Sequence, residues 1–282
     1  MYHASNCAPH GFERKFHVWL SRSAAAIALL LFGAQQTAAQ QDSFVFATPD
    51  QATDGSIEVI GAKSAKPEIW PATLIFKSAI GGCTATVVGP QAVLTAAHCI
   101  EDGASGQIKI HSQPIKAQCK RHPGYKNTNT THDFALCNTD APISGVAFEA
   151  VNTSIAFPKV AMPITILGYG CTTPGGFDRN FGMLFSGTAT VTRLPRNDDL
   201  YTITHGGAAV CFGDSGGAAY VYDDAIQRHR LIVGVNSKGD ISEVSYISST
   251  DTEAFVSWAI DWSKQTKAFI CGIHTEATGC RP

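Results

Sequence analysis

Gly213-Asp214-Ser215-Gly216-Gly217 decides how this sequence is interpreted. Two other short stretches precede it, Thr95-Ala96-Ala97-His98-Cys99 and His132-Asp133-Phe134-Ala135-Leu136. Taken singly, each has a plain structural interpretation, as a core histidine, a turn aspartate or a glycine-rich loop. Taken together, they bring an imidazole, a carboxylate and a hydroxyl into one chain, and these three groups can act chemically as a unit.

The chemistry of such a unit explains each residue type. A serine hydroxyl becomes a useful nucleophile when an adjacent imidazole accepts its proton, and the imidazole needs a carboxylate that fixes its tautomer. Glycines let the backbone turn tightly, so that two N–H groups can bind one oxyanion, each donor contributing about 2.7–4 kcal/mol. We therefore predict His98, Asp133 and Ser215 as catalytic residues, with Gly213 and Ser215 as the oxyanion hole.

The three stretches resemble the signatures of the chymotrypsin/trypsin family of serine proteases, in the family's order His, Asp, Ser. The resemblance extends over about residues 59–262 and implies an all-β fold: two six-stranded antiparallel β-barrels with a C-terminal helix. It also implies a serine endopeptidase that cleaves protein or peptide substrates through an acyl-enzyme intermediate. Further stretches that carry it are Trp70-Pro71, Gly168-Tyr169-Gly170 and residues 231–239, which resemble the substrate-pairing strand with Ser237 near the triad.

From residue 59 onward, short apolar and β-branched runs alternate with glycine, proline and asparagine. Short strands at close spacing favour a barrel or a sandwich. Near the end, Phe255, Trp258, Ala259 and Trp262 recur at helical spacing, which predicts one amphipathic helix over residues 252–267. The runs predicted as strands are 72–76, 85–88, 107–110, 164–167, 186–192, 218–222 and 231–235.

The N-terminus has the three parts of a secretory signal peptide. Arg14, Lys15 and Arg22 are basic, residues 24–33 are apolar, and residues 37–39 are small. A membrane anchor is the alternative, but crossing a bilayer takes about 20 apolar residues. We therefore predict a signal peptide over 1–39, a propeptide or linker over 40–58, a protease domain over 59–282, and a secreted (extracellular or periplasmic) product.

Charge and composition exclude several partners. The formal net charge is −2 and charged residues are 16% of the chain, without a long run of one sign. We therefore expect no nucleic-acid partner and, in the mature form, no membrane. Neither CxxC nor HExxH occurs, so we expect no metal and no cofactor. We expect the mature chain to be a monomer.

Val59-Ile60-Gly61-Ala62 resembles the new N-terminus that the family's precursors expose on activation. The resemblance implies that cleavage after Glu58 frees the α-amino group of Val59, which then pairs with Asp214 and orders the oxyanion loop. An activating protease would be a partner, and the active form would have 224 residues (282 − 58). The alternative is a chain ordered without cleavage, in which other donors hold Asp214.

The chain has nine cysteines, and Cys7 lies in the predicted signal peptide. The other eight are an even number in an exported chain, which predicts disulfides whose pairing the sequence alone leaves open. The family resemblance implies a Cys83–Cys99 bridge that pins the histidine loop, and Cys171–Cys211 beside the nucleophile loop. Nearness in sequence favours the remaining pairs, Cys119–Cys137 and Cys271–Cys280.

In the family, the floor of the primary specificity pocket lies six residues before the nucleophile, which is Ala209 here. Trypsin-like members carry an aspartate there, so a preference for Lys or Arg is not supported. Asp240 or Glu243 could supply a buried charge instead. Otherwise Ala209, Gly239 and Val244 predict an apolar pocket for small or medium aliphatic, or aromatic, side chains.

Two other interpretations fit part of the sequence. Residues 213–217 also match the G-x-S-x-G elbow of α/β-hydrolases. That interpretation needs Asp251 or Asp261 with His274, demands a parallel sheet, and leaves His98 and Asp133 unexplained. The other is a non-catalytic homologue that acts as a binding module. Such proteins usually lose a triad residue or an oxyanion glycine, and all of these are present here.

Overall fold

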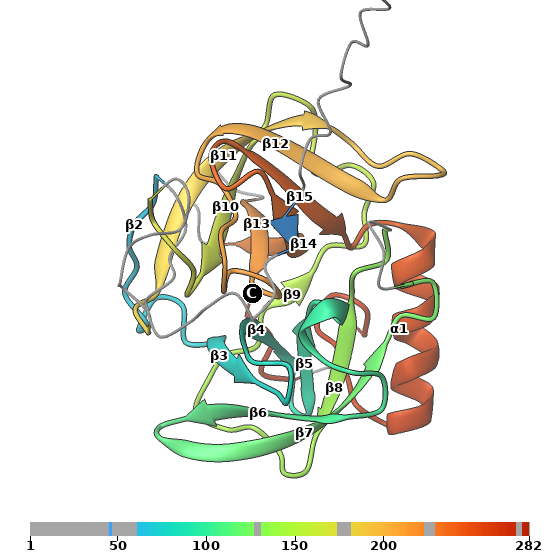
Figure 1. Cartoon of the computed structure of the whole chain (residues 1–282). Coiled ribbons are helices and arrows are strands. Elements are labelled where there is room, and N and C mark those ends of the chain that lie inside the picture. Colours follow the sequence, from blue (N-terminus) through green and yellow to red (C-terminus); the bar gives the residue numbers. More distant parts are fainter. Residues whose placement is uncertain are drawn as a thin grey trace, which may run out of the picture. The chain divides into compact units, whose positions relative to one another are not determined.

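The computed structural model describes residues 61–126, 131–173, 182–222, 229–274 and 278–281, together with the backbone of 45–46. Within these ranges the chain forms two β-barrels and one α-helix (Figure 1). The predicted signal peptide over 1–39 lies outside the described residues, as does Val59.

The first barrel is a closed set of strands in the order β3-β4-β5-β8-β7-β6, with every pairing antiparallel. Phe76, Leu94, Ile108 and Leu136 are fully buried in its core. Gly106 makes room for the largest of them, because a Cβ at 106 would lie 2.1 Å from the Phe76 ring. The strands are β3 Thr73–Lys77, β4 Gly82–Gly89, β5 Ala92–Thr95, β6 Ser105–Ile110, β7 Gln113–Arg121 and β8 Ala135–Thr139.

The second barrel runs β10-β11-β12-β15-β14-β13, and β13 pairs back with β10. Its core gathers β-branched residues such as Ile164, Ile166, Val191 and Val233. Two short strands attach to β14, namely β1 Val45–Phe46 and β9 Ala150–Val151, and β2 Lys63–Ser64 attaches to β11. The barrel strands are β10 Pro163–Gly168, β11 Phe185–Arg193, β12 Tyr201–Gly207, β13 Ala218–Tyr222, β14 Arg230–Gly239 and β15 Val244–Ser249.

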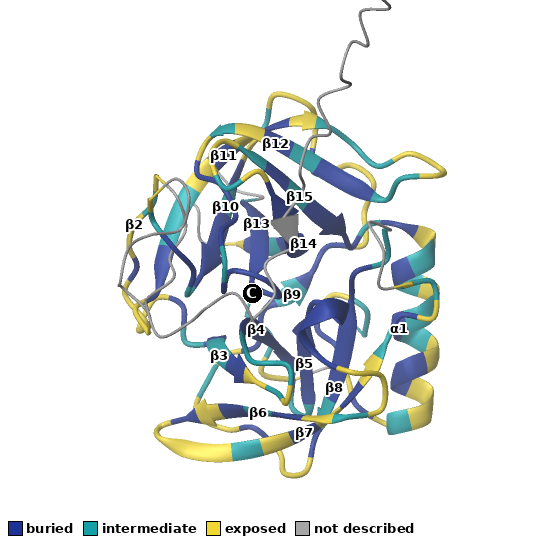
Figure 2. Cartoon of the chain, viewed as in Figure 1, coloured by how far each residue is buried: buried dark blue, intermediate teal, exposed yellow. Residues whose placement is uncertain are grey.

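The helix α1 spans Glu253–Thr266, one residue short of the predicted range at each end. Thr252 caps it, since its hydroxyl accepts a hydrogen bond from the Phe255 N–H, and Lys267 ends it in the left-handed conformation. Phe255, Ala259 and Trp262 are buried, so one face of the helix packs inward and the other stays exposed (Figure 2). None of the helices that the structure describes is long and apolar enough to cross a membrane.

The architecture confirms the predicted fold class of two six-stranded antiparallel barrels with a C-terminal helix. Each of the seven predicted strand runs falls within or overlaps an observed strand. The strand β1 falls within 40–58, the predicted propeptide or linker, for which no strand was predicted.

Candidate active site

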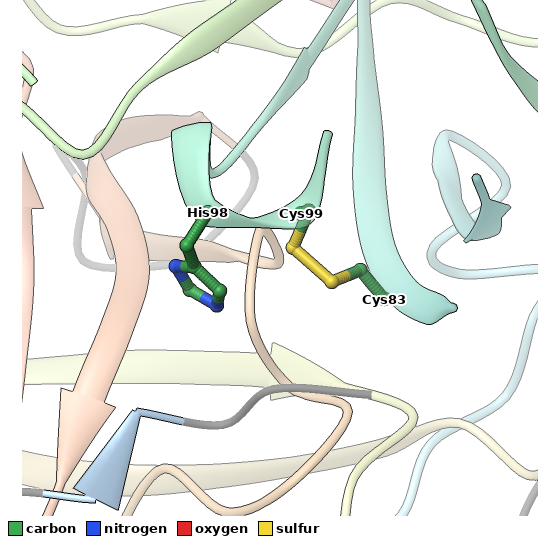
Figure 3. Close-up of side chains that lie close together, drawn as sticks. All are labelled: Cys83, His98 and Cys99. Carbon is green, nitrogen blue, oxygen red and sulfur yellow. A yellow bond between two sulfur atoms is a disulfide. The ribbon is translucent and has the colours of Figure 1, made fainter. Parts of the chain in front are cut away.

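His98 lies in a single 3-10 turn, Ala97–Cys99, that directly follows β5. A disulfide from Cys99 to Cys83 of β4 fastens this turn to the first barrel (Figure 3). Ala96 and Ala97 are fully buried, and their small side chains let the turn pack closely. The His98 side chain is itself 4% exposed, so its orientation is set by protein groups rather than by water.

Asp133 directly precedes the strand-entry residue Phe134, and its carboxylate is fully buried. Its Oδ1 accepts the backbone N–H of His98 at 2.9 Å, and its Oδ2 lies 2.7 Å from His98 Nδ1. Ser237 Oγ donates to the same Oδ2 at 2.6 Å. Burial alone would raise the pKa of Asp133, but the charge and hydrogen bonds of His98 and the Ser237 hydroxyl hold that pKa below its usual range.

An ionised Asp133 fixes one tautomer of His98. The proton sits on Nδ1, facing the carboxylate, which leaves the Nε2 lone pair as the basic site. A base oriented in this way can take a proton from a hydroxyl.

Tyr201 extends the network into the second barrel. Its hydroxyl lies 3.2 Å from Ser237 Oγ, and both side chains are buried. Burial, together with the nearby charge of Asp133, raises the pKa of Tyr201, so the phenol stays protonated. Sequence reasoning missed this residue because no motif surrounds it.

Ser215 is fully buried in the loop that leads into β13. Gly213 and Gly216 have φ of 90° and 82°, in the left-handed region that glycine tolerates. A Cβ on Gly216 would lie 2.1 Å from Thr95 Oγ1 and 2.3 Å from the Thr84 carbonyl oxygen. The backbone geometry therefore requires these glycines of the sequence motif.

Thr84 of β4 holds this loop against the first barrel. Its N–H donates to the Ser215 carbonyl at 2.8 Å, and its hydroxyl donates to the Gly213 carbonyl at 2.7 Å. The neighbouring Cys83 carries the disulfide to the His98 turn. One strand therefore positions both the serine and the histidine. Sequence reasoning missed Thr84, for which the only signal was its place beside Cys83.

Asp214 is fully buried, and backbone amides hold its carboxylate. Oδ1 accepts the Gly170 N–H at 2.7 Å, and Oδ2 accepts the Cys211 N–H at 2.9 Å. A Cβ on Gly168 or Gly170 would lie 2.1 Å or 2.2 Å from this side chain. The predicted Gly168-Tyr169-Gly170 motif therefore makes space for Asp214.

The predicted specificity residues lie in apolar surroundings. Ala209 is fully buried with Cys171 and Cys211, and Phe212 and Ile241 pack against this cluster. A Cβ on Gly239 would lie 2.6 Å from the Val244 carbonyl oxygen, so β14 and β15 approach closely there.

The two alternative sources of charge do not form a buried site. Asp240 is exposed, and its Oδ1 accepts the N–H groups of Ser242, Glu243 and Val244. The Glu243 side chain is 57% exposed and lies 3.4 Å from His205. Neither carboxylate provides the buried counter-charge that the sequence left open.

Among the residues that the structure describes, four disulfides join eight cysteines in the pairs that the family resemblance and sequence proximity had suggested. Such a set is characteristic of chains that fold in an oxidising compartment. The pairs are Cys83–Cys99, Cys119–Cys137, Cys171–Cys211 and Cys271–Cys280.

A group of potential metal ligands overlaps this site. The ligand atoms of Cys83, His98 and Cys99 lie within 4.8 Å of one another. Because the two sulfurs are bonded to each other, they do not offer thiolates to a metal (Figure 3). We interpret the group as the disulfide that supports the histidine turn.

Two six-stranded antiparallel barrels followed by a C-terminal helix are the architecture of chymotrypsin-like serine endopeptidases. The sequence model of the trypsin family matches residues 59–259, more than half of the chain, so the chain belongs to that family. Its substrates are accordingly proteins or peptides.

Proteins named trypsin are similar to this chain in sequence. A trypsin from Phaedon cochleariae is 26% identical over 212 residues, which cover 64% of this chain and 80% of that protein. A trypsin from Saccharopolyspora erythraea is 26% identical over 210 residues, 64% of this chain and 87% of that protein. Trypsin zeta from Drosophila erecta is 27% identical over 172 residues, 50% of this chain and 61% of that protein.

Proposed function

We propose that His98, Asp133 and Ser215 are the catalytic triad of a secreted serine endopeptidase, with the N–H groups of Gly213 and Ser215 as its oxyanion hole. The observation that carries this proposal is the buried Asp133 carboxylate, 2.7 Å from His98 Nδ1 and hydrogen-bonded by two further donors. A carboxylate in that position prepares the imidazole to act as a base.

In the proposed reaction, Ser215 Oγ attacks the carbonyl carbon of the peptide bond while its proton passes to His98 Nε2. Asp133 stays ionised and stabilises the imidazolium that forms. The oxyanion of the tetrahedral intermediate accepts hydrogen bonds from the Gly213 and Ser215 N–H groups. His98 then gives its proton to the departing amine, and water hydrolyses the acyl-Ser215 ester by the same steps.

Labelling with a serine-reactive phosphonate tests the triad. Processed wild-type protein should be labelled on Ser215, and Ser215→Ala should not be labelled. A processed, folded wild-type chain that resists labelling would contradict the proposal and favour the binding-module alternative. Failure to label an unprocessed chain alone would identify that chain as an inactive precursor.

We further propose that cleavage after Glu58 activates the enzyme. Asp214 supports this, because it is fully buried beside the nucleophile, at the position where the family's aspartate pairs with the freed α-amino group. Gly61 lies beside the segment that leads to Asp214, since a Cβ there would be 2.9 Å from the Gly207 carbonyl oxygen. N-terminal sequencing of the active species should return Val59, whereas an active species that begins well before Val59 would refute cleavage there.

The apolar surroundings of Ala209 support a small or medium aliphatic P1 preference, with aromatic residues as the next candidates. Apolar pockets discriminate by about 1–3 kcal/mol per methylene, so the preference should be graded rather than absolute. A panel of peptide substrates that differ only at P1 measures it. Clear preference for Arg or Lys would show that the proposed pocket is wrong.

We also propose that a signal peptide over 1–39 directs the chain out of the cytoplasm, that residues 40–58 are a propeptide, and that 59–282 form the monomeric protease domain. Four disulfides support an extracellular or periplasmic destination. Mass spectrometry of the exported chain and light scattering of the purified enzyme test these boundaries and the monomeric state.

A further inference from the structure

The strand β1 comes from the predicted propeptide but pairs with the protease domain. Val45 lies opposite Gly239 and Phe46 opposite Lys238, in antiparallel register with the end of β14. Figure 1 shows β1 as the blue arrow beside β14. Fourteen residues (61 − 46 − 1) separate Phe46 from Gly61, where the described domain begins.

The edge that β1 occupies is the one that leads to Ser215. On one side of β14, Asn236, Lys238 and Gly239 pair with β15. On the other side, the pairing of β14 with β13 ends at Val235 of β14, and Asn236 of β14 bonds instead to the nucleophile loop. There the Asn236 carbonyl accepts the Gly216 N–H, and the Asn236 N–H donates to the Gly217 carbonyl. Further along the same edge, Lys238 and Gly239 pair with β1.

The same edge touches the proposed triad. Ser237 lies between the part of β14 that holds the nucleophile loop and the part that pairs with β1, and its hydroxyl donates to Asp133. The Lys238 ammonium lies over the rings of Tyr201 and Tyr246, 4.9 Å and 5.1 Å from their centroids. Gly239 has no side chain. What β14 offers at this point is therefore a backbone edge, which any extended peptide can join by β-augmentation.

We propose that β1 is an autoinhibitory strand that occupies the substrate-pairing edge of β14 until the chain is cut between it and the protease domain. This inference rests on the proposed protease function, because it assigns β14 the role of pairing with substrate. An antiparallel segment at Lys238 and Gly239 excludes a substrate backbone from the same N–H and C=O groups.

The tether makes such a short pairing effective. A covalent linker of this length can raise the local concentration of its segment to the millimolar range. If the free segment binds with a dissociation constant of about 0.1 mM, an effective concentration of about 1 mM slows peptide access about tenfold. Cleavage after Glu58 would break the tether, so that the segment dilutes away while Val59 is freed.

Two serine-reactive probes of different size test the proposal on the full exported chain, confirmed by mass to be uncleaved. A small alkyl fluorophosphonate needs Ser215 and the oxyanion hole but not the edge of β14. A tripeptidyl phosphonate with alanine at P1 needs both. The labelling rate of the tripeptidyl phosphonate divided by that of the fluorophosphonate therefore measures how accessible the edge of β14 is. The state of the oxyanion loop affects both rates and cancels in this ratio.

We expect Val45→Pro/Phe46→Pro to raise this ratio about tenfold, because proline donates no backbone hydrogen bond and successive residues alternate in bonding to the partner strand. The matched control Val45→Ile/Phe46→Tyr keeps both N–H groups and strand propensity, so its ratio should equal that of wild type. Equal ratios in wild type and the proline variant would overturn the proposal.

Hydrogen exchange separates this inference from the protease function itself. In a Ser215→Ala chain, the peptide covering 236–240 should exchange more slowly than in Ser215→Ala/Val45→Pro/Phe46→Pro. Equal exchange in the two chains would overturn the placement of β1, whatever the labelling shows. If the small probe labels neither the cleaved nor the uncleaved chain, the protease function fails, while the exchange result still decides whether β1 covers β14.

Discussion

The two barrels deliver their parts of the site by different physical means. The first barrel supplies His98 and Asp133. The Asp133 carboxylate bonds to both the backbone and the ring of His98, and the Cys83–Cys99 disulfide holds the turn that carries His98. The second barrel supplies Ser215 from a loop whose shape depends on backbone conformation. There, Gly213 and Gly216 adopt left-handed φ values, and the carbonyls of Gly213 and Ser215 accept hydrogen bonds from Thr84.

This difference separates two kinds of damage. A polar substitution in the first barrel can keep the fold and lose the chemistry, because a side chain of similar size can still accept the His98 backbone N–H that Asp133 Oδ1 accepts. A substitution at a loop glycine must move the backbone, so it should cost stability as well as activity. Asp133→Asn and Gly216→Ala test that separation.

Asp133→Asn should lower the rate of Ser215 labelling and of peptide hydrolysis about 10⁴-fold. The amide keeps the size of the side chain but favours the wrong tautomer of His98 and does not stabilise the imidazolium. Parallel rate measurements and urea unfolding on wild type and the variant check this. An intact hydrolysis rate in a folded Asp133→Asn enzyme would refute the assigned role.

Gly216→Ala should destabilise the folded chain by more than about 3 kcal/mol, because left-handed strain adds to a clash with Thr95 Oγ1 and the Thr84 carbonyl. Gly103 is the matched control. It also has a positive φ, 75°, but a Cβ there would meet no atom within 4 Å. Gly103→Ala should therefore cost only about 1 kcal/mol of strain. Urea midpoints measure both, and equal losses would show that steric closeness at the nucleophile loop does not matter.

The sequence was sufficient for the parts of the fold whose signals are local. Residue type and local spacing predict the glycines with left-handed φ, the small residues beside His98 and the amphipathic run of α1. The missed strands have weaker patterns. In β7, exposed Lys116, Gln118 and Lys120 alternate with a few buried residues, and in β12 the buried face carries Thr202 and Thr204.

Contacts between distant segments were beyond sequence reasoning. Thr84 reaches Gly213 across 129 positions, and Tyr201 reaches Ser237 across 36. Neither residue belongs to a motif, because its role depends on how the barrels meet. The strand β1 is a similar case, since a segment of two residues is a strand only because it pairs with β14.

The smallest of the expected effects is a pH response that belongs to the first barrel. His122 is 7% exposed, stacks on His132 at 4.6 Å and meets the edge of Trp258. Its Nε2 lies 3.2 Å from the Ala254 carbonyl oxygen, and its Nδ1 accepts the Gly124 N–H at 3.0 Å. Burial is the main reason that the pKa of His122 is lowered to about 4; the Ala254 hydrogen bond raises this pKa, and the neighbouring His132 lowers it by a smaller amount.

Because the folded pKa lies below the unfolded value of about 6.5, the unfolded chain binds more protons between these two values. Folding stability should therefore fall by roughly 2–3 kcal/mol as the pH drops from about 6.5 to about 4, and His122 should cause no further loss of stability below about pH 4.

His122→Asn keeps an acceptor near Gly124 but removes the titration, so the difference in Tm between pH 7 and pH 4.5 should shrink. The control His205→Gln changes a second-barrel histidine whose side chain is 52% exposed, and it should keep the wild-type difference. If His122→Asn keeps the full wild-type difference as well, the pH response lies elsewhere, and the contrast between the barrels does not extend to titration.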